Sequence, residues 1–151
     1  MATEYNSKHG IVSKSPYELY MSFVDMRTFA QMLPEDKRDS VKADFDTLSV
    51  TVQGFNIGVR VINRTPYSLI MIEDNGAPFH FGINLHFDAV SDPYKTEFYI
   101  EAQADLNLMM KMMLGSKIKQ GLDSIVDGLV AVSEGRMPEG VDPEMLKNFK
   151  M

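Results

Sequence analysis

The chain has 151 residues, of which 44% are hydrophobic and 24% are charged, the balance of an ordinary globular domain with a sizeable core. Its formal net charge of −6 disfavours nucleic acids and anionic membrane surfaces, because both attract basic proteins. The absence of cysteine excludes disulfides, thiolate zinc sites and a cysteine nucleophile.

The N-terminal region predicts a strand followed by a helix. Residues 4–13 have the apolar content of a strand, and Gly10 is a candidate bulge within it. Ser15 and Glu18 then form a capping box, with Pro16 between them at the first helical position. A helical stripe of apolar side chains follows and predicts a short helix that ends near residue 25.

A second short helix is predicted directly after the first. Asp25 can cap it, its sequence runs from Met26 to Leu33, and Pro34 ends it because proline cannot continue a helix. The polar run 35–39 separates this helix from the next element. Two consecutive short helices are therefore expected after one strand.

Residues 41–104 predict a meander of about six antiparallel strands. Apolar and polar residues alternate there with a period of two, which is typical of strands with one buried face. Turn-forming residues interrupt the alternation at 46–47, 53–56, 63–66, 74–78 and 91–93. The strands expected between these turns cover residues 41–45, 48–52, 57–61, 67–73, 79–87 and 96–104.

The last strand leads into one long helix, from about Leu106 to about Glu134. At about 1.5 Å per residue this helix reaches ~43 Å, which exceeds the diameter of a small globule. It must therefore lie along the body of the protein, with one face on the sheet. We expect residues 1–135 to form a single domain and residues 136–151 to be a loosely ordered tail.

This order of elements resembles the helix-grip superfamily, which includes the polyketide cyclase/dehydrase-like, START-like and birch-pollen-allergen-like proteins. The resemblance rests on the segment 15–20 through Asp25, on Leu33 and Pro34, and on residues 102–107 entering the Met-rich helix. It implies an α+β fold in which a sheet of about seven strands curls around the C-terminal helix and encloses an apolar pocket. The superfamily has no universal catalytic residue, so the resemblance assigns none here.

The long helix presents an apolar face that is expected to meet the sheet. Plotted at about 100° per residue, this face holds Met110, Met113, Leu114, Ile118, Ile125, Leu129 and Val132. Gly121 and Gly128 share it, and they allow either a close approach to the sheet or room for a ligand; close packing is the preferred interpretation. Lys117 lies in the same stripe, and we favour a solvated ammonium group over a contact with an acidic ligand.

The sheet is expected to offer a dry, apolar inner face, because its ionisable residues fall on the opposite parity of each strand. The face is predicted to consist of Phe79, Phe81, Ile83 and Leu85, of Phe98, Ile100 and Ala102, and of Ile57, Val59 and Val61. The candidate cavity-lining residues are Met110, Met113, Leu114, Lys117, Gly121 and Ile125 on the helix, with Phe79, Phe81, Ile83, Phe98 and Ile100 on the sheet.

The sequence offers no catalytic constellation, and we expect no cofactor and no metal. His80 and His86 share a strand face, but their spacing is wide and a solvated face is the better interpretation. Asp44 and Asp46 are interpreted as solubilising charges on an amphipathic strand. Whether the protein is an enzyme stays open, with a preference against it.

Three functions remain compatible with these observations. The leading hypothesis is binding of a small hydrophobic molecule, such as a lipid, isoprenoid or polyketide-like compound, between the sheet and the C-terminal helix. A cyclase or aromatase would use the same cavity with a buried polar group, for which Lys117, Tyr99 and Tyr20 are the first suspects. An interaction module would have a filled core, with Met145, Leu146 and Phe149 of the tail as a partner contact or dimer strap.

The sequence shows neither a signal-peptide pattern at residues 1–6 nor the run of ~20 apolar residues that a membrane span needs. We therefore expect a cytoplasmic protein without a membrane span. Its expected partner is a small hydrophobic molecule rather than nucleic acid, and a homodimer remains open.

Overall fold

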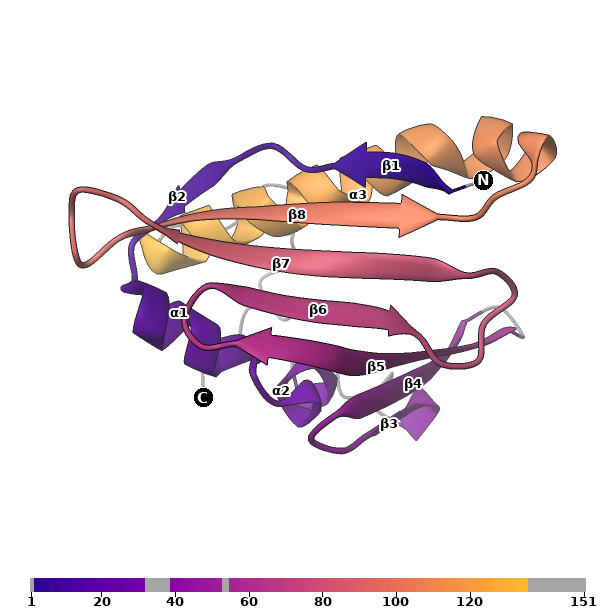
Figure 1. The fold of residues 1–151 in the computed structure, drawn as a ribbon, viewed down its shortest axis with the longest axis horizontal. Coiled ribbons are helices and arrows are strands. Elements are labelled where there is room, and N and C mark those ends of the chain that lie inside the picture. Colours follow the sequence, from indigo (N-terminus) through magenta and orange to yellow (C-terminus); the bar gives the residue numbers. More distant parts are fainter. Residues whose placement is uncertain (1, 32–38, 53–54, 136–151) are drawn as a thin grey trace.

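The computed structural model of the chain describes residues 2–31, 39–52 and 55–135. These residues form one antiparallel sheet with helices on a single face, which we call the inner face (Figure 1). The strands are β1 (Thr3–Asn6), β2 (Gly10–Val12), β3 (Val41–Ala43), β4 (Thr47–Val52), β5 (Phe55–Thr65), β6 (Leu69–Asp74), β7 (Phe81–Ala89) and β8 (Thr96–Ala104). The helices are α1 (Pro16–Phe23), α2 (Met26–Gln31) and α3 (Leu108–Ser133).

The sheet is a meander whose strand order is β1-β8-β7-β6-β5-β4-β3, with β2 also paired to β8. Its longest pairing joins β7 to β8, from Phe81 opposite Ala104 to Ala89 opposite Thr96. Successive strands from β3 to β8 pair antiparallel with one another, as the alternating sequence predicts. The predicted α+β helix-grip architecture is confirmed.

The first predicted strand is in fact two short strands on the same neighbour, β8. Ser7 separates them and is buried, with 6% of its surface exposed. Its backbone N–H donates to the Ile100 carbonyl at 2.9 Å, and its hydroxyl accepts from the Ile100 N–H at 2.8 Å. The hydroxyl thus satisfies a buried strand N–H at the break, so the edge continues as β2 without an orphaned polar group.

The two short helices begin where the capping residues predict. The Ser15 hydroxyl accepts a hydrogen bond from the Glu18 N–H at 3.2 Å, with Pro16 at the first helical position. An Asp25 carboxylate oxygen accepts from the Arg27 N–H at 2.9 Å at the start of α2. The predicted end of α2 at Leu33 and Pro34 lies outside the described residues, as does the tail 136–151.

The position of α3 depends on the missing side chain at Gly10 in β2. A Cβ atom built at Gly10 lies 2.6 Å from Val126 Cγ1 and 2.8 Å from Val130 Cγ2, closer than real Cβ atoms approach. Val126 is fully buried in the core between α3 and the sheet. Glycine therefore marks a close approach of β2 to α3, where the sequence favoured a bulge.

Polar contacts tie the same side of α3 to the β1–β2 edge. Lys119 Nζ donates to the Asn6 carbonyl at 2.7 Å, and the Lys8 N–H donates to Asp123 Oδ1 at 2.6 Å. The Lys8 ammonium also lies 2.9 Å from the Asp127 carboxylate. These contacts orient the helix about its axis, so one flank faces this edge.

Within the described ranges, no helix combines the length and the apolar character that a bilayer crossing requires.

Substituting Gly10 tests the close approach directly. We expect Gly10→Ala to lower the free energy of unfolding by about 1–3 kcal/mol, because the branched side chains of Val126 and Val130 have little freedom to move aside. Gly121→Ala is the matched control: no atom lies within 4 Å of its Cβ position, so alanine should stabilise the helix by up to about 1 kcal/mol. Urea unfolding of both variants checks the opposite signs, and a neutral Gly10→Ala would contradict the account.

Candidate functional site

The inner face of the sheet is fully buried at one end. In the paired rows of β7 and β8, Phe87 and Phe98 are each 1% exposed. Rings from α1 pack on them, with centroids 5.9 Å apart for Tyr20–Phe87 and 6.1 Å apart for Phe23–Phe98. This end is an aromatic core under α1.

Elsewhere on the inner face, five apolar side chains are only half-buried, although they lie beside the buried Ile70, Ile72 and Leu85. They lie in rows that the strand register defines, since Leu48 pairs with Val59 and Ile83 pairs with Ala102. Val61 lies on the same face and is also half-buried. We call Leu48, Val59, Val61, Ile83 and Ala102 the half-buried layer; it contacts the core but is not covered by it.

Among the described residues, no helix contacts β5 or β6 extensively, which leaves Val59 and Val61 in the middle of the layer half-buried. α3 contacts β1, β2 and β8, whereas α2 contacts β3 and β4 and α1 contacts β7 (Figure 1). With about 100° per residue, Gly121 and Ile125 lie on the flank of α3 opposite Asp123 and Asp127. Because those two aspartates face the β1–β2 edge, the flank with Gly121 and Ile125 faces the middle of the sheet.

The predicted helix face is observed only in part: Ile118 and Leu129 pack against the core and are half-buried. Leu122 and Val126 make the buried contact with the sheet. Met113 and Ile125, predicted on the buried face, are 63% and 50% exposed, and Val132 is 39% exposed. The prediction was wrong for these residues because apolar side chains are spread around much of the circumference of α3. Their periodicity alone therefore does not identify the side of the helix that packs on the sheet.

Gly121 and Lys117 also differ in part from expectation. Gly121 is exposed and meets open space, so the preferred close-packing interpretation was wrong and the space beside it is empty of described atoms. Lys117 is exposed, in agreement with the solvated interpretation.

The structure separates the other candidate residues into two groups. Phe98 and Ile100 are 1% and 2% exposed and belong to the core. The half-buried residues Phe79, Phe81 and Ile83 gather where β7 begins, and Met110 and Leu114 lie half-buried in the first turns of α3. The start of β7 and the start of α3 lie at the same end of the sheet, because β8 ends at Ala104, the pairing partner of Phe81, just before α3 begins. Their role in lining a ligand site stays a prediction.

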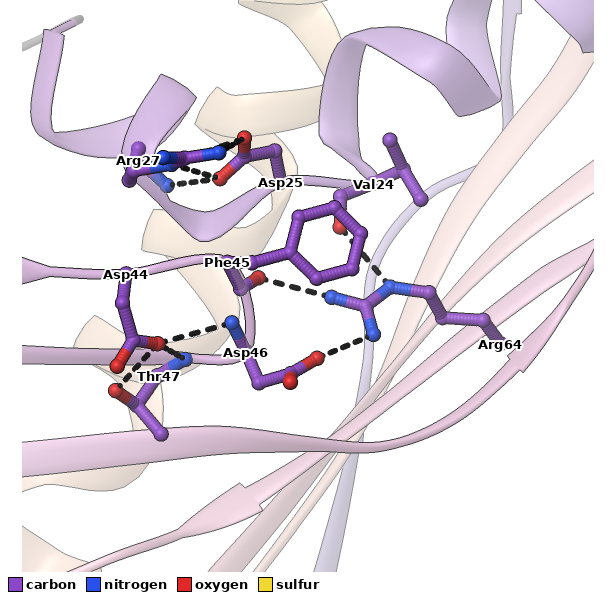
Figure 2. A network of polar contacts seen from close by, with 8 residues as sticks. All are labelled: Val24, Asp25, Arg27, Asp44, Phe45, Asp46, Thr47 and Arg64. Carbon is purple, nitrogen blue, oxygen red and sulfur yellow. Dashed lines mark hydrogen bonds and ion pairs between the residues drawn. The ribbon is translucent and has the colours of Figure 1, made fainter.

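Arg64 joins the two short helices to the sheet, as Figure 2 shows. Its guanidinium donates to the Val24 carbonyl at 3.0 Å, to the Phe45 carbonyl at 2.9 Å and to Asp46 Oδ1 at 2.6 Å. The same group stacks on the Phe45 ring, 4.2 Å from its centroid. One cation therefore anchors the α1–α2 junction and the β3–β4 turn to β5.

Sequence reasoning missed Arg64 because a bulge hides its orientation. The pairing of β5 with β6 shifts between Val61 and Asn63, so simple alternation assigns Arg64 to the outer face. With the bulge, Arg64 pairs with the buried Ile70 and shares its inner face. Only the turn-forming residues after Asn63 hinted at irregular backbone there.

Tyr67 closes the α1 end of the inner face in a strained conformation. Its φ of 64° lies in the left-handed region, which bulky residues rarely adopt. Its ring centroid lies 5.2 Å from that of Tyr17 and 5.5 Å from that of Tyr20, so packing on α1 offsets the strain. Tyr20 is 5% exposed, and it alone of the three enzymatic suspects lies in the interior.

Tyr99 lies on the outer face, stacked between two histidines. Its ring centroid is 4.0 Å from that of His9 and 4.4 Å from that of His86. Burial, together with the nearby Asp88 carboxylate, raises the pKa of the Tyr99 phenol above its ordinary value. Among the described residues, no group of three or more His, Cys, Asp and Glu side chains is arranged to hold a metal ion.

Solved structures of similar shape define the class of fold. The chain aligns with a START superfamily protein from Mycobacterium smegmatis at a TM-score of 0.56 and 14% identity, covering 85% of this chain and 98% of that one. It aligns with a norcoclaurine synthase point mutant from Thalictrum flavum, in complex with a transition-state analogue, at 0.64 and 13% identity, covering 89% and 96%. The Aha1 dimer from Colwellia psychrerythraea aligns at 0.55 and 12% identity, covering 85% and 96%.

These similarities show that the chain has the START-like helix-grip fold. No protein-family model matches the sequence, and no curated protein matches it. At sequence identities of 12–14%, these similarities establish the fold of the chain and assign no functional residue to it.

Removing the Arg64 guanidinium should loosen the anchor of the short helices. We expect Arg64→Met to lower the free energy of unfolding by about 2–3 kcal/mol, since it breaks three hydrogen bonds at a side chain that is 19% exposed. Arg60→Met is the matched control, because the Arg60–Glu73 pair is largely solvent-exposed and should change stability by less than about 1 kcal/mol. Urea unfolding measures both variants, and an equal loss of stability in Arg64→Met and Arg60→Met would contradict the anchoring role of Arg64.

Asp74 should contribute an acid-sensitive component of stability. The Phe81 N–H, which donates to its carboxylate at 2.8 Å, and then His80 hold the pKa of Asp74 below its ordinary value of 3.8. A depressed pKa in the folded state stabilises the fold fully above 3.8, and this stabilisation is lost as the pH falls through the lower folded-state pKa. Melting temperatures measured between neutral and strongly acidic pH should therefore fall less steeply for Asp74→Asn than for the wild type, and parallel curves would contradict the assignment.

Proposed function

We propose that the protein binds a small hydrophobic molecule between the half-buried layer and the flank of α3 that carries Gly121 and Ile125. The observation that carries the proposal is this pair of apolar surfaces facing one space without covering each other. Ile125 is 50% exposed on the helix, and the side chains of the layer are half-buried on the sheet. A ligand there removes apolar area from water on both sides, at roughly 25 cal/mol per Å².

The ligand would enter at the end of the sheet where α3 begins. Phe79, Phe81, Ile83, Met110 and Leu114 are half-buried at that end and would line the entrance. The flexible thioether of Met110 would adapt to the shape of the ligand. The aromatic core with Phe98 and Ile100 would form the closed end, under α1.

The fold supports this proposal by analogy. A similar structure, the norcoclaurine synthase complex, contains a transition-state analogue, so a protein with this fold holds a small molecule. For a hydrophobic ligand the absence of charge on the layer is favourable, because an unpaired buried charge opposes binding. Of the three polar groups expected in a cyclase or aromatase, Tyr99 lies on the outer face, Lys117 is exposed, and Tyr20 alone is buried, packed in the aromatic core. Binding therefore has more support than catalysis.

A second candidate function is protein interaction through the first turns of α3. Leu108, Met109, Met112 and Met113 are 75%, 70%, 79% and 63% exposed, an unusual concentration of large apolar side chains on two helical turns. A homodimer through these residues is the simplest form of this candidate. Sedimentation velocity with a Met109→Lys, Met112→Lys variant tests it: a dimer that the double substitution dissociates supports the interaction, and a wild-type monomer contradicts the homodimer.

Filling the space beside Gly121 tests ligand binding. The neutral apolar dye N-phenyl-1-naphthylamine serves as the probe, and its fluorescence should rise saturably with the wild-type protein. We expect Gly121→Leu to weaken this binding about tenfold or more, a loss of at least about 1.4 kcal/mol, because the new side chain occupies the ligand space.

Gln120→Leu is the matched control for this experiment. It adds the same side chain at an exposed position on a different flank of α3, and it should leave dye affinity unchanged. Equal affinity of wild type and Gly121→Leu would place the dye elsewhere and overturn the proposed site.

A further inference from the structure

The outer face of the sheet carries a hollow that is separate from the proposed hydrophobic site. Its volume is about 390 Å³, and it is open to solvent. Its centre is a cross-strand row in which Glu73 of β6, Gly82 of β7 and Gln103 of β8 are paired. The sheet itself lies between this hollow and α3, because these three residues have the opposite parity to Ile72, Ile83 and Ala102 of the inner face.

Gly82 creates the space. Its two neighbours in the row have long side chains, whereas Gly82 has none, and this leaves a gap between them. A Cβ atom at Gly82 meets only the Ile72 carbonyl oxygen, at an ordinary 3.7 Å. The backbone therefore accepts larger residues there, and glycine is not required by packing.

Two carboxamides in the lining have no hydrogen-bond partner among the described residues. Asn84 is half-buried on β7, two residues from Gly82 and on the same face. Gln103, which is exposed, lies on the other side of the row. An amide in this position offers both a donor and an acceptor to a ligand, and a half-buried amide gains more from such a partner than an exposed one.

The lining combines an apolar wall with carboxylates. Ile62, which the bulge in β5 leaves 48% exposed, provides the wall together with Met71. Asp74 and Glu73 contribute carboxylates; Glu73 is paired with Arg60 and Asp74 contacts His80 at 3.1 Å, so the ligand would share Asp74 with this histidine. A cationic group fits such a rim better than an anion, because the chain is also acidic overall, at −6.

We propose that this hollow is a second binding site, for a small molecule with a flat apolar body and a cationic amine or amidine edge. The body packs on Ile62 and Met71. The edge meets the carboxylate of Asp74 and the free amides of Asn84 and Gln103. This site is independent of the hydrophobic-ligand proposal, since the two lie on opposite faces of the sheet.

Benzamidine is the probe for this site, because it joins one aromatic ring to one amidinium. Titration of the ¹⁵N-labelled full chain, followed by amide chemical shifts, should give saturable changes at Gly82 and at the side-chain amides of Asn84 and Gln103. The neutral isostere benzamide should bind at least about fivefold more weakly, because it lacks the charge that the carboxylates attract. Equal affinities for the two probes would overturn the assignment of a cationic ligand.

A substitution that fills the hollow tests whether benzamidine binds there. Gly82→Val should weaken benzamidine binding about tenfold or more without unfolding the sheet, because Val suits a strand and its Cβ meets no close atom. Thr51→Val adds an apolar residue at an exposed outer-face position of β4 and should bind as the wild type does. Asn84→Leu, of similar volume, should also weaken binding, which tests the amide separately from the space.

Two results would overturn the proposal. One is a wild-type titration in which no shift saturates, or in which the shifts lie away from the hollow. The other is an unchanged benzamidine affinity in Gly82→Val, with the folded spectrum retained.

Discussion

The close contact between β2 and α3 at Gly10 determines where the long helix lies on the sheet, and the extent of the covered inner face follows from that position. Any side chain at Gly10 would collide with Val126 and Val130, so glycine lets the helix settle onto the outermost strands of the sheet. The pairing of Lys8 with Asp123 and Asp127 then fixes the rotation of the helix. Because α3 sits at this edge, it shields only part of the inner face.

A separate set of contacts, centred on Arg64, holds the two short helices on the sheet. Arg64 binds the α1–α2 junction and the β3–β4 turn to β5, and its hydrogen bonds add to the apolar packing of Phe23 and Met26 in the core. The strained Tyr67 closes the end nearest α1 by packing on Tyr17 and Tyr20. Two separately anchored helical units thus hold the sheet from both sides and leave the half-buried layer between them.

The elements of the fold were predictable from the sequence because each has a local cause. The capping box at Ser15 and Glu18 and the alternation along β7 and β8 depend on neighbouring residues alone. Contacts between distant segments were not predictable in the same way. The role of Gly10 depends on a helix more than a hundred residues later, and the orientation of Arg64 depends on a bulge that the sequence does not mark.

The candidate site was predictable in outline only. Phe79, Phe81 and Ile83 do gather at one end of the sheet near the start of α3, because strand parity and element order place them there. The packing stripe of α3 was not predictable, since apolar residues surround so much of the helix that periodicity leaves its rotation open. The hollow beside Gly82 was invisible as well, because it arises from the register of three strands.

Native mass spectrometry of the freshly purified protein tests the central claim, that a hydrophobic molecule fills the space between the half-buried layer and α3. The account predicts an additional mass that is retained under native conditions, lost on denaturation, and restored when the stripped protein is mixed with a panel of lipids and isoprenoids. The same panel should fail to bind Gly121→Leu. A protein that is empty as purified and binds no member of the panel would contradict the account, and the inner face would then be ordinary core.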